Sequence, residues 1–149
     1  MIENNYRKLP FMYLEISGRQ TGKTTRLINQ IYADKDKYDL QILMGINWIS
    51  LKQIKNNVKR NNKLKICLSY ESFQSETLGK NNIRLYVDEF LYSTAFCNNF
   101  LNFMLFNDII QNGYFVSSIN TNKYHIYSQL KELNNNFVNS MYVSSGDFL

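Results

Sequence analysis

The chain has 149 residues, with 17 basic and 12 acidic side chains and a formal net charge of +5. Hydrophobic residues make up 44% and charged residues 19%, which excludes global disorder and predicts a single domain over residues 1–149. No apolar run approaches the ~20 residues of a membrane span, and residues 1–10 lack the apolar core of a secretory signal. We therefore expect a cytoplasmic protein that is not secreted and has no membrane partner.

The two cysteines, Cys67 and Cys97, are isolated from each other, and His125 is the only histidine. A structural zinc site needs a cluster of such ligands, so the sequence argues against one. Both cysteines have apolar neighbours, and we expect small buried side chains in a reducing compartment rather than a disulfide.

Short apolar runs alternate with helical patterns along the chain. Strands are predicted at 11–16, 41–46, 64–69, 83–87, 114–119 and 137–143. Helices are predicted over 24–33, from 50 onward, over 70–78, from 93 or 94 to about 111, and over 123–133. This alternation favours βαβ units, so the expected fold is an α/β three-layer sandwich with a mostly parallel central sheet.

Two of these helices have recognisable start signals. Ser50 and Gln53 form a capping-box pattern, in which each side chain satisfies the other residue's free amide. Ser93 or Thr94 is expected to cap a long amphipathic helix that runs to about Gln111.

The segment after the first predicted strand has the composition of a phosphate-binding loop. It reads Ser17-Gly18-Arg19-Gln20-Thr21-Gly22-Lys23-Thr24-Thr25 and leads into a helix. Small residues let a backbone wrap phosphates, while amides and a helix N-terminus supply positive potential. We predict that this segment binds ATP, that Lys23 reaches the β- and γ-phosphates, and that the Thr24 hydroxyl ligates Mg²⁺.

One position departs from the G-x-x-x-x-G-K-[ST] pattern. Ser17 stands where the first glycine belongs, and Gly18 comes one place late, while Gly22, Lys23 and Thr24 match. The alternative is a glycine-bearing loop that only caps the helix.

A second motif ends the strand predicted at 83–87. The apolar run is followed by Asp88 and Glu89, about 65 residues after the loop, which is the Walker B pattern. At the carboxyl end of a parallel strand, Asp88 can hold Mg²⁺ or its water shell. Glu89 is then placed to polarise a water molecule aimed at the γ-phosphate. The alternative is an exposed pair of acids at a strand end.

The strand at 114–119 ends in the polar run Ser117-Ser118-Ile119-Asn120-Thr121. In an additional-strand P-loop fold this strand lies close to the γ-phosphate, where Ser118 or Asn120 can hydrogen bond to it. The alternative is an ordinary strand exit rich in serine and asparagine.

Together these motifs resemble the additional-strand catalytic-glutamate P-loop ATPases with a RecA-like core. Within that group, residues 19–24 most resemble the Walker A motif of large terminases and related phage DNA-packaging ATPases, and Asp88-Glu89-Phe90 is similar to their Walker B. The resemblance covers roughly residues 11–122. It implies ATP and Mg²⁺ as ligands and a cis arginine, Arg19, that contacts the γ-phosphate. The alternative for Arg19 is a solvent-exposed or acid-paired side chain.

A chain of this length has no room for a terminase nuclease domain or a second RecA-like domain. If the protein is a motor, we expect its other parts on partner viral proteins or on further copies of this chain. A viral protein of this kind would work in the host cytoplasm.

The main concentration of basic residues lies between positions 52 and 65. Lys52, Lys55, Lys59 and Arg60 give a cationic stripe that suits the phosphates of DNA or RNA. The alternative is the solvated face of an amphipathic helix. Tyr70 is expected to pack in the core rather than to stack on bases.

Three functions follow from these motifs. The first is a Mg²⁺-dependent ATPase that couples hydrolysis to nucleic-acid handling. The second is a small nucleoside or nucleotide kinase, although no zinc cysteines or arginine-rich lid are evident. The third is a non-hydrolysing nucleotide-binding module that organises an assembly.

Overall fold

The computed structural model describes residues 12–18, 22–59, 61–106 and 112–135. Within these residues a five-stranded, all-parallel sheet has the strand order β1-β5-β4-β2-β3. The strands are β1 (Tyr13–Ile16), β2 (Leu40–Met44), β3 (Leu64–Ile66), β4 (Ile83–Asp88) and β5 (Tyr114–Ser117). The helices are α2 (Lys23–Ala33), α3 (Trp48–Asn57), α4 (Tyr70–Thr77), α5 (Thr94–Asn98), α6 (Phe100–Met104), the 3₁₀ turn η1 (Thr121–Lys123) and α8 (Tyr124–Asn135).

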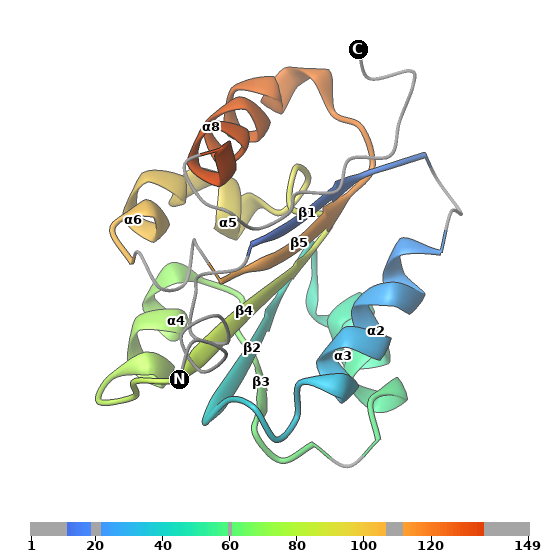
Figure 1. The fold of residues 1–149 in the computed structure, drawn as a ribbon, viewed down its shortest axis with the longest axis vertical. Coiled ribbons are helices and arrows are strands. Elements are labelled where there is room, and N and C mark those ends of the chain that lie inside the picture. Colours follow the sequence, from blue (N-terminus) through green and yellow to red (C-terminus); the bar gives the residue numbers. More distant parts are fainter. Residues whose placement is uncertain (1–11, 19–21, 60, 107–111, 136–149) are drawn as a thin grey trace, which may run out of the picture.

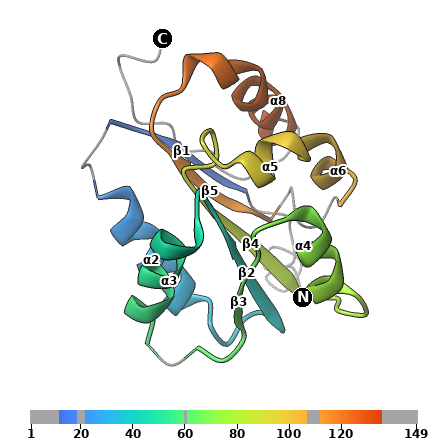
Figure 2. The same ribbon diagram turned by 180° about the vertical axis from the view of Figure 1, so that it is seen from behind.

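Helices cover both faces of the sheet (Figures 1 and 2). Helices α2 and α3 lie on one face, and α4, α5, α6 and α8 lie on the other. The expected α/β fold with a parallel central sheet is therefore confirmed. Because all strands are parallel, Ser17 and Gly18 after β1 and Asp88 at the end of β4 lie at the same edge of the sheet.

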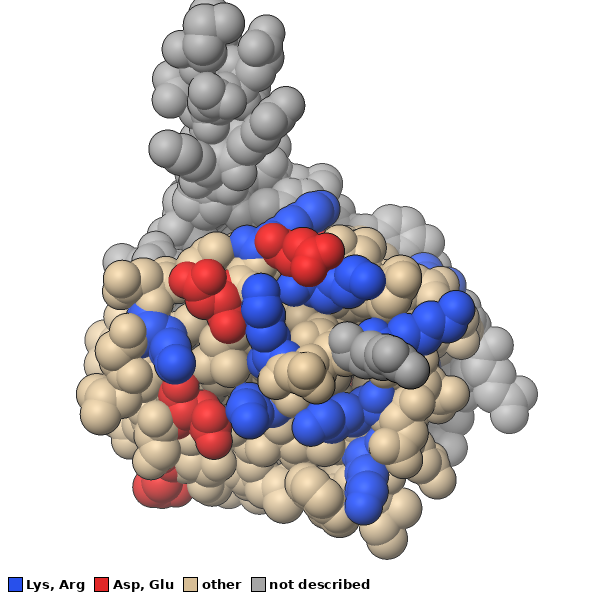
Figure 3. Space-filling model, turned by 90° about the horizontal axis from the view of Figure 1, so that it is seen from below, with Lys and Arg blue, Asp and Glu red and all other residues tan. Residues whose placement is uncertain are grey.

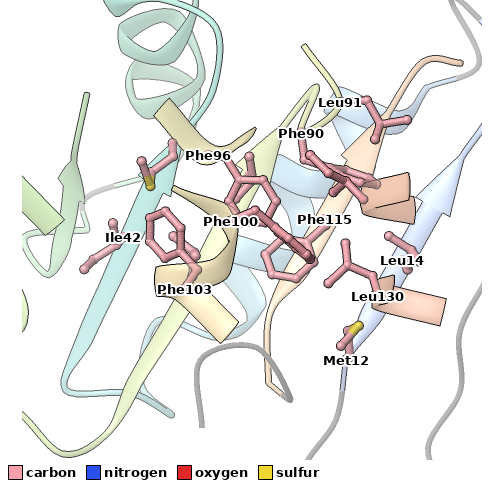
Figure 4. Packing of buried hydrophobic residues seen from close by; sticks show 14 of the residues in the cluster. Met12, Leu14, Ile42, Phe90, Leu91, Phe96, Phe100, Phe103, Phe115 and Leu130 are labelled. Carbon is pink, nitrogen blue, oxygen red and sulfur yellow. The ribbon is translucent and has the colours of Figure 1, made fainter. Parts of the chain in front are cut away.

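Two separate apolar clusters hold the layers together, because successive side chains of a strand point to opposite faces. On β2, Ile42 belongs to the cluster under α5, α6 and α8, while Leu43 belongs to the cluster under α2 and α3. The first cluster is rich in aromatic rings. Figure 4 shows Phe96, Phe103 and Phe115 in it, and all three are fully buried. A strand buried on both faces carries the continuous apolar run that identified it in the sequence.

The start of α3 differs from the prediction. The helix begins at Trp48, and its cap is Asn47, whose side chain accepts a hydrogen bond from the Ser50 amide at 2.9 Å. The Ser50–Gln53 capping box is therefore wrong. Asn47 lies three residues earlier and takes the Ser50 amide, so Ser50 becomes a residue of the first helical turn.

Up to residue 106, the long helix predicted after Ser93 is divided into two short helices, α5 and α6, and its predicted last part, 107–111, lies outside the described residues. Ser93 caps α5 as expected, accepting from the Phe96 amide at 3.3 Å. The break falls at Asn99, whose side-chain amide donates to the Ala95 carbonyl at 3.1 Å. Asparagine side chains compete with the helix backbone in this way, and the backbone of Asn99 leaves the helical region. The strand predicted at 137–143 lies outside the described residues.

Two buried carboxylates attach α2 to its neighbouring strands. Asp34, at the C-terminal cap of α2, accepts hydrogen bonds from Arg84 Nη1 at 2.6 Å and from the Tyr86 hydroxyl at 2.7 Å. Both partners belong to β4. Near the other end of α2, Arg26 forms an ion pair with Glu15 of β1. The helix that carries Lys23 and Thr24 is thus fixed to both motif-bearing strands.

Removing Arg84 tests the first attachment. Arg84→Met leaves the Asp34 carboxylate without its buried cation, since the other basic partner, Lys37 Nζ, is 3.8 Å away on a largely exposed side chain. We expect the free energy of unfolding to fall by about 3–5 kcal/mol. The double variant Asp34→Leu/Arg84→Met removes both charges and is expected to lose much less. Urea denaturation of the three proteins measures this. Equal losses in the single and double variants would show that the ion pair does not hold α2 in place.

Candidate functional site

The first contact of the site joins the two sequence motifs. The Thr24 hydroxyl, in the first turn of α2, donates a hydrogen bond to Asp88 Oδ1 at the end of β4, at 3.3 Å. The two residues are 64 positions apart in the chain. The structure therefore brings together the two side chains that the sequence assigned to a magnesium ion.

Lys23 lies beside this pair at the start of α2. Its side chain is 5% exposed, and its ammonium group donates to the Gly18 carbonyl at 3.1 Å. A buried ammonium group is costly without an anionic partner, and a single carbonyl satisfies only one of its three donors. The Lys23 ammonium group therefore lies next to the backbone of Gly18, just after β1, with donors left for an anion.

Gly22 forms the entrance to α2 with a left-handed backbone, φ +82°. A side chain here would be strained, and its Cβ would lie 3.1 Å from Arg26 Nη1. As the N-cap residue, glycine offers no side-chain acceptor to the first amides of the helix. The first turn of α2 contains no acidic residue. Its amides can therefore serve an external anion.

Asp88 is 8% exposed, and its pKa is raised to about 6. Burial is the main cause, and the neighbouring negative charge of Glu89 adds to it. The Thr24 hydrogen bond and the positive charge of Lys23 act in the opposite direction. Two acids at one strand end favour binding of a cation, because a cation compensates the buried charge of Asp88 and offsets its repulsion with Glu89.

Glu89 has a left-handed backbone, with φ 53°, and it is the only such non-glycine residue among those described. Its carboxylate accepts from the Ser118 amide at 2.6 Å and from the Ser118 hydroxyl at 3.2 Å. The Ser117 hydroxyl oxygen lies 3.4 Å from Glu89 Oε1, and its proton goes to the Ser118 carbonyl at 2.8 Å. Both serines lie at the end of β5, which stands between β1 and β4. The unusual backbone and the serines together fix where this carboxylate points.

The other predicted site residues have varied positions. Ser17 is buried, and its hydroxyl donates to Glu15 Oε2 at 3.0 Å. Thr25 is exposed on the first turn of α2. Asn120 donates to the Leu91 carbonyl at 2.9 Å, and its side-chain oxygen caps η1. Arg19, Gln20, Thr21 and Arg60 lie outside the described residues, so their roles stay predictions.

Sequence reasoning missed Glu15, which is fully buried on β1. Burial works to raise its pKa, but hydrogen bonds from Arg26, Tyr13 and Ser17 hold the pKa below its ordinary value. An acid inside an otherwise apolar strand run was the available signal. Such a residue needs a buried partner, and Arg26, on the helix that follows, is a basic residue within reach.

The remaining predictions for side chains concern the core and the surface. Tyr70 is buried and packs edge-on against Phe103, which confirms its assignment to the core. Cys67 is buried and Cys97 is half-buried, and both are free thiols. Lys52, Lys55 and Lys59 are exposed.

In the described part of the chain, no three His, Cys, Asp or Glu side chains lie close enough to hold a metal ion. Mg²⁺ at a nucleotide site takes most of its ligands from phosphates and water, so one carboxylate and one hydroxyl suffice. Thr24 and Asp88 fit that requirement. None of the described helices is long and apolar enough to cross a membrane.

No protein-family model matches the chain, and a search of curated proteins finds no match. The geometry of the site is therefore what a functional proposal rests on.

The raised pKa of Asp88 gives a stability prediction for the protein without Mg²⁺ or nucleotide. Between pH 3.8 and about 6, the folded protein binds more protons at Asp88 than the unfolded chain does, so this group lowers stability as the pH rises through that window. Asp88→Asn removes the effect and should raise the free energy of unfolding at neutral pH by on the order of 1–3 kcal/mol.

Chemical denaturation across this pH range measures the difference between Asp88→Asn and the unaltered protein. The two stabilities should converge toward the acidic end. A variant that is no more stable than the parent at neutral pH would contradict the account of Asp88.

Proposed function

We propose that the protein is a Mg²⁺-dependent ATPase with a RecA-like P-loop core, which couples ATP hydrolysis to nucleic-acid handling. The observation that carries the proposal is the hydrogen bond between Thr24 and Asp88, because it joins the loop motif to the acidic motif at one edge of the sheet. The position of β5 between β1 and β4 also supports it, since the additional strand is expected beside the γ-phosphate.

The phosphate-binding part consists of residues from the start of α2. The amides of the first turn and the Lys23 ammonium would bind the phosphates, in place of the Gly18 carbonyl that Lys23 now contacts. Thr24 and Asp88 would hold Mg²⁺, which neutralises charge on the phosphates when bound. The raised pKa of Asp88 fits a carboxylate whose natural partner is a cation.

Glu89 is the proposed general base. A carboxylate has about four acceptor positions, and the Ser118 amide and hydroxyl occupy two of them in this structure. The remaining capacity can orient a water molecule and accept its proton as the water attacks the γ-phosphate. A kinase that transfers phosphate to a hydroxyl acceptor has less need of such a group beside the metal aspartate.

The partners of the ATPase are proposed from surface charge and from the resemblance of the motifs. Exposed lysines on α3 favour DNA or RNA as the polymer. Because the sequence motifs resemble those of DNA-packaging ATPases, we propose an assembly with copies of this chain or with viral partner proteins.

Two substitutions separate nucleotide binding from hydrolysis. Lys23→Ala should abolish ATP binding, because the phosphates lose their main positive side chain. Glu89→Gln should keep ATP binding and lower hydrolysis roughly 10²–10⁴-fold. Calorimetry measures binding, and phosphate release with and without DNA or RNA measures turnover.

The matched controls are Lys80→Ala and Glu132→Gln, which change exposed residues away from the site and should leave both measurements unaltered. Undiminished turnover in Glu89→Gln would remove the assignment of the base. A phosphorylated nucleoside as product would instead identify a kinase, and stoichiometric binding without turnover would identify a binding module.

Ser118 is proposed as a positioning residue that acts through Glu89. Ser118→Ala removes the hydroxyl contact but keeps the amide contact, so kcat should fall roughly 3- to 30-fold while KM for ATP stays the same. Ser118→Thr restores a hydroxyl and should recover most of the rate. An equal loss in both variants, or a change confined to KM, would contradict this role.

A further inference from the structure

Trp48 is the only tryptophan of the chain. It is the first residue of α3 and is 48% exposed, although one side of this helix is buried in the core. The ammonium group of Lys52, one turn later, lies 5.9 Å from the centre of its ring. A large aromatic ring left half in solvent beside a cation is a common element of surfaces that stack on bases.

Lysines extend from this ring along α3. Lys52 and Lys55 follow Trp48 at four and seven positions, which places them on one side of α3, and Lys59 lies just beyond the end of the helix, after the extended residue Val58. The opposite side, with Leu51 and Ile54, is buried. Within the described residues, no carboxylate oxygen lies within 4.0 Å of the ammonium group of any of the three lysines. Their charge is therefore available to an anionic partner.

Beside Trp48 the surface has a groove of about 450 Å³. Its apolar wall includes Ile46, Leu68 and Tyr70, and the polar residues that line it include Asn47, Asn98 and the acidic Glu71. Ile46 and Leu68 are about half exposed, at 51% and 49%. An apolar wall that carries amides offers both stacking surface and hydrogen bonds, which are what an unpaired base requires.

The groove lies at the same edge of the sheet as the candidate ATP site. Gly45, which follows β2, lines it, and a Cβ at Gly45 would lie 3.1 Å from the Asp88 carbonyl oxygen. From there α3 runs back toward the amino ends of the strands. Figure 3 shows Lys and Arg side chains gathered on the face at those amino ends, with fewer Asp and Glu among them. Lys52 and Lys55 thus lead away from the groove along α3.

We propose that this surface binds single-stranded nucleic acid, with a base stacked on Trp48 in the groove and the following phosphates along Lys52, Lys55 and Lys59. Trp48 and Lys55 are about 10 Å apart along the helix axis, so the row of lysines can contact more than one phosphate of a strand. A duplex has no unstacked base to offer the groove. The proposal deepens the proposed function, because it names single-stranded nucleic acid as the polymer. It rests on the proposed function only for the reason why the protein binds a polymer, while the binding itself is argued from this surface.

The test uses the single tryptophan as the probe. Oligothymidylate is added to the protein without ATP or Mg²⁺, and quenching of Trp48 fluorescence is followed together with the anisotropy of labelled oligonucleotide. Saturable quenching is expected. Trp48→Ala should weaken binding roughly 5- to 100-fold, and Trp48→Phe should recover part of the loss.

The lysines are tested by salt dependence. Lys52→Gln/Lys55→Gln should make the slope of log affinity against log salt shallower by about 1.4. The matched controls lie in η1 and α8, across the sheet from α3, where Tyr124→Ala removes an aromatic ring that is 46% exposed and Lys123→Gln/Lys131→Gln removes the same charge. Both controls should bind like the parent protein.

Three results would overturn the proposal. They are unchanged affinity in Trp48→Ala, equal or tighter binding of duplex DNA, and equal quenching by polyglutamate or by a free nucleotide. Since no ATP is present, none of these results bears on hydrolysis. Conversely, loss of turnover in Glu89→Gln with intact oligonucleotide binding would concern hydrolysis alone, and the proposal for this binding surface would stand.

Discussion

The attachment of α2 by two buried carboxylates is the constraint on which the candidate site depends. Asp34 fixes the C-terminal end of the helix to β4, and Glu15 fixes its first turns to β1. Buried acids are expensive unless they are fully paired, so each accepts several hydrogen bonds. With both ends of α2 fixed, Thr24 is held next to Asp88 before any ligand binds.

The acids at the end of β4 show the opposite design. Asp88 and Glu89 are adjacent, largely withdrawn from solvent and of the same charge, which raises the pKa of Asp88. Glu89 also has a left-handed backbone. These features work against stability, and a bound cation with its phosphates would relieve the electrostatic part. The protein thus combines a firmly anchored helix with a strand end that is under strain.

The fold class and the meeting of the two motifs were predictable from the sequence, because they depend on local patterns. Buried parallel strands are continuous apolar runs, and their carboxyl ends must lie at one edge. Competition between side chains for the backbone was not predictable. Asn47 caps α3 in place of the predicted Ser50, and Asn99 interrupts a helix whose apolar periodicity continues beyond it.

The candidate site was likewise predictable only in part. Lys23, Thr24, Asp88 and Glu89 belong to motifs with fixed spacing, and the structure brings them to one edge of the sheet. The contacts of Ser118 with Glu89 depend on β5 inserting between β1 and β4, and strand order is not encoded in any local pattern. Trp48 was overlooked because one aromatic residue at a helix start has no periodic signal of its own.

The most direct test of the account is a crystal structure with Mg²⁺ and a non-hydrolysable ATP analogue. We expect the triphosphate at the first turn of α2, and Mg²⁺ about 2.0–2.1 Å from the Thr24 hydroxyl oxygen, with Asp88 bound to it directly or through one water molecule. A nucleotide bound elsewhere, or a metal ion that does not involve Thr24 and Asp88, would contradict the account.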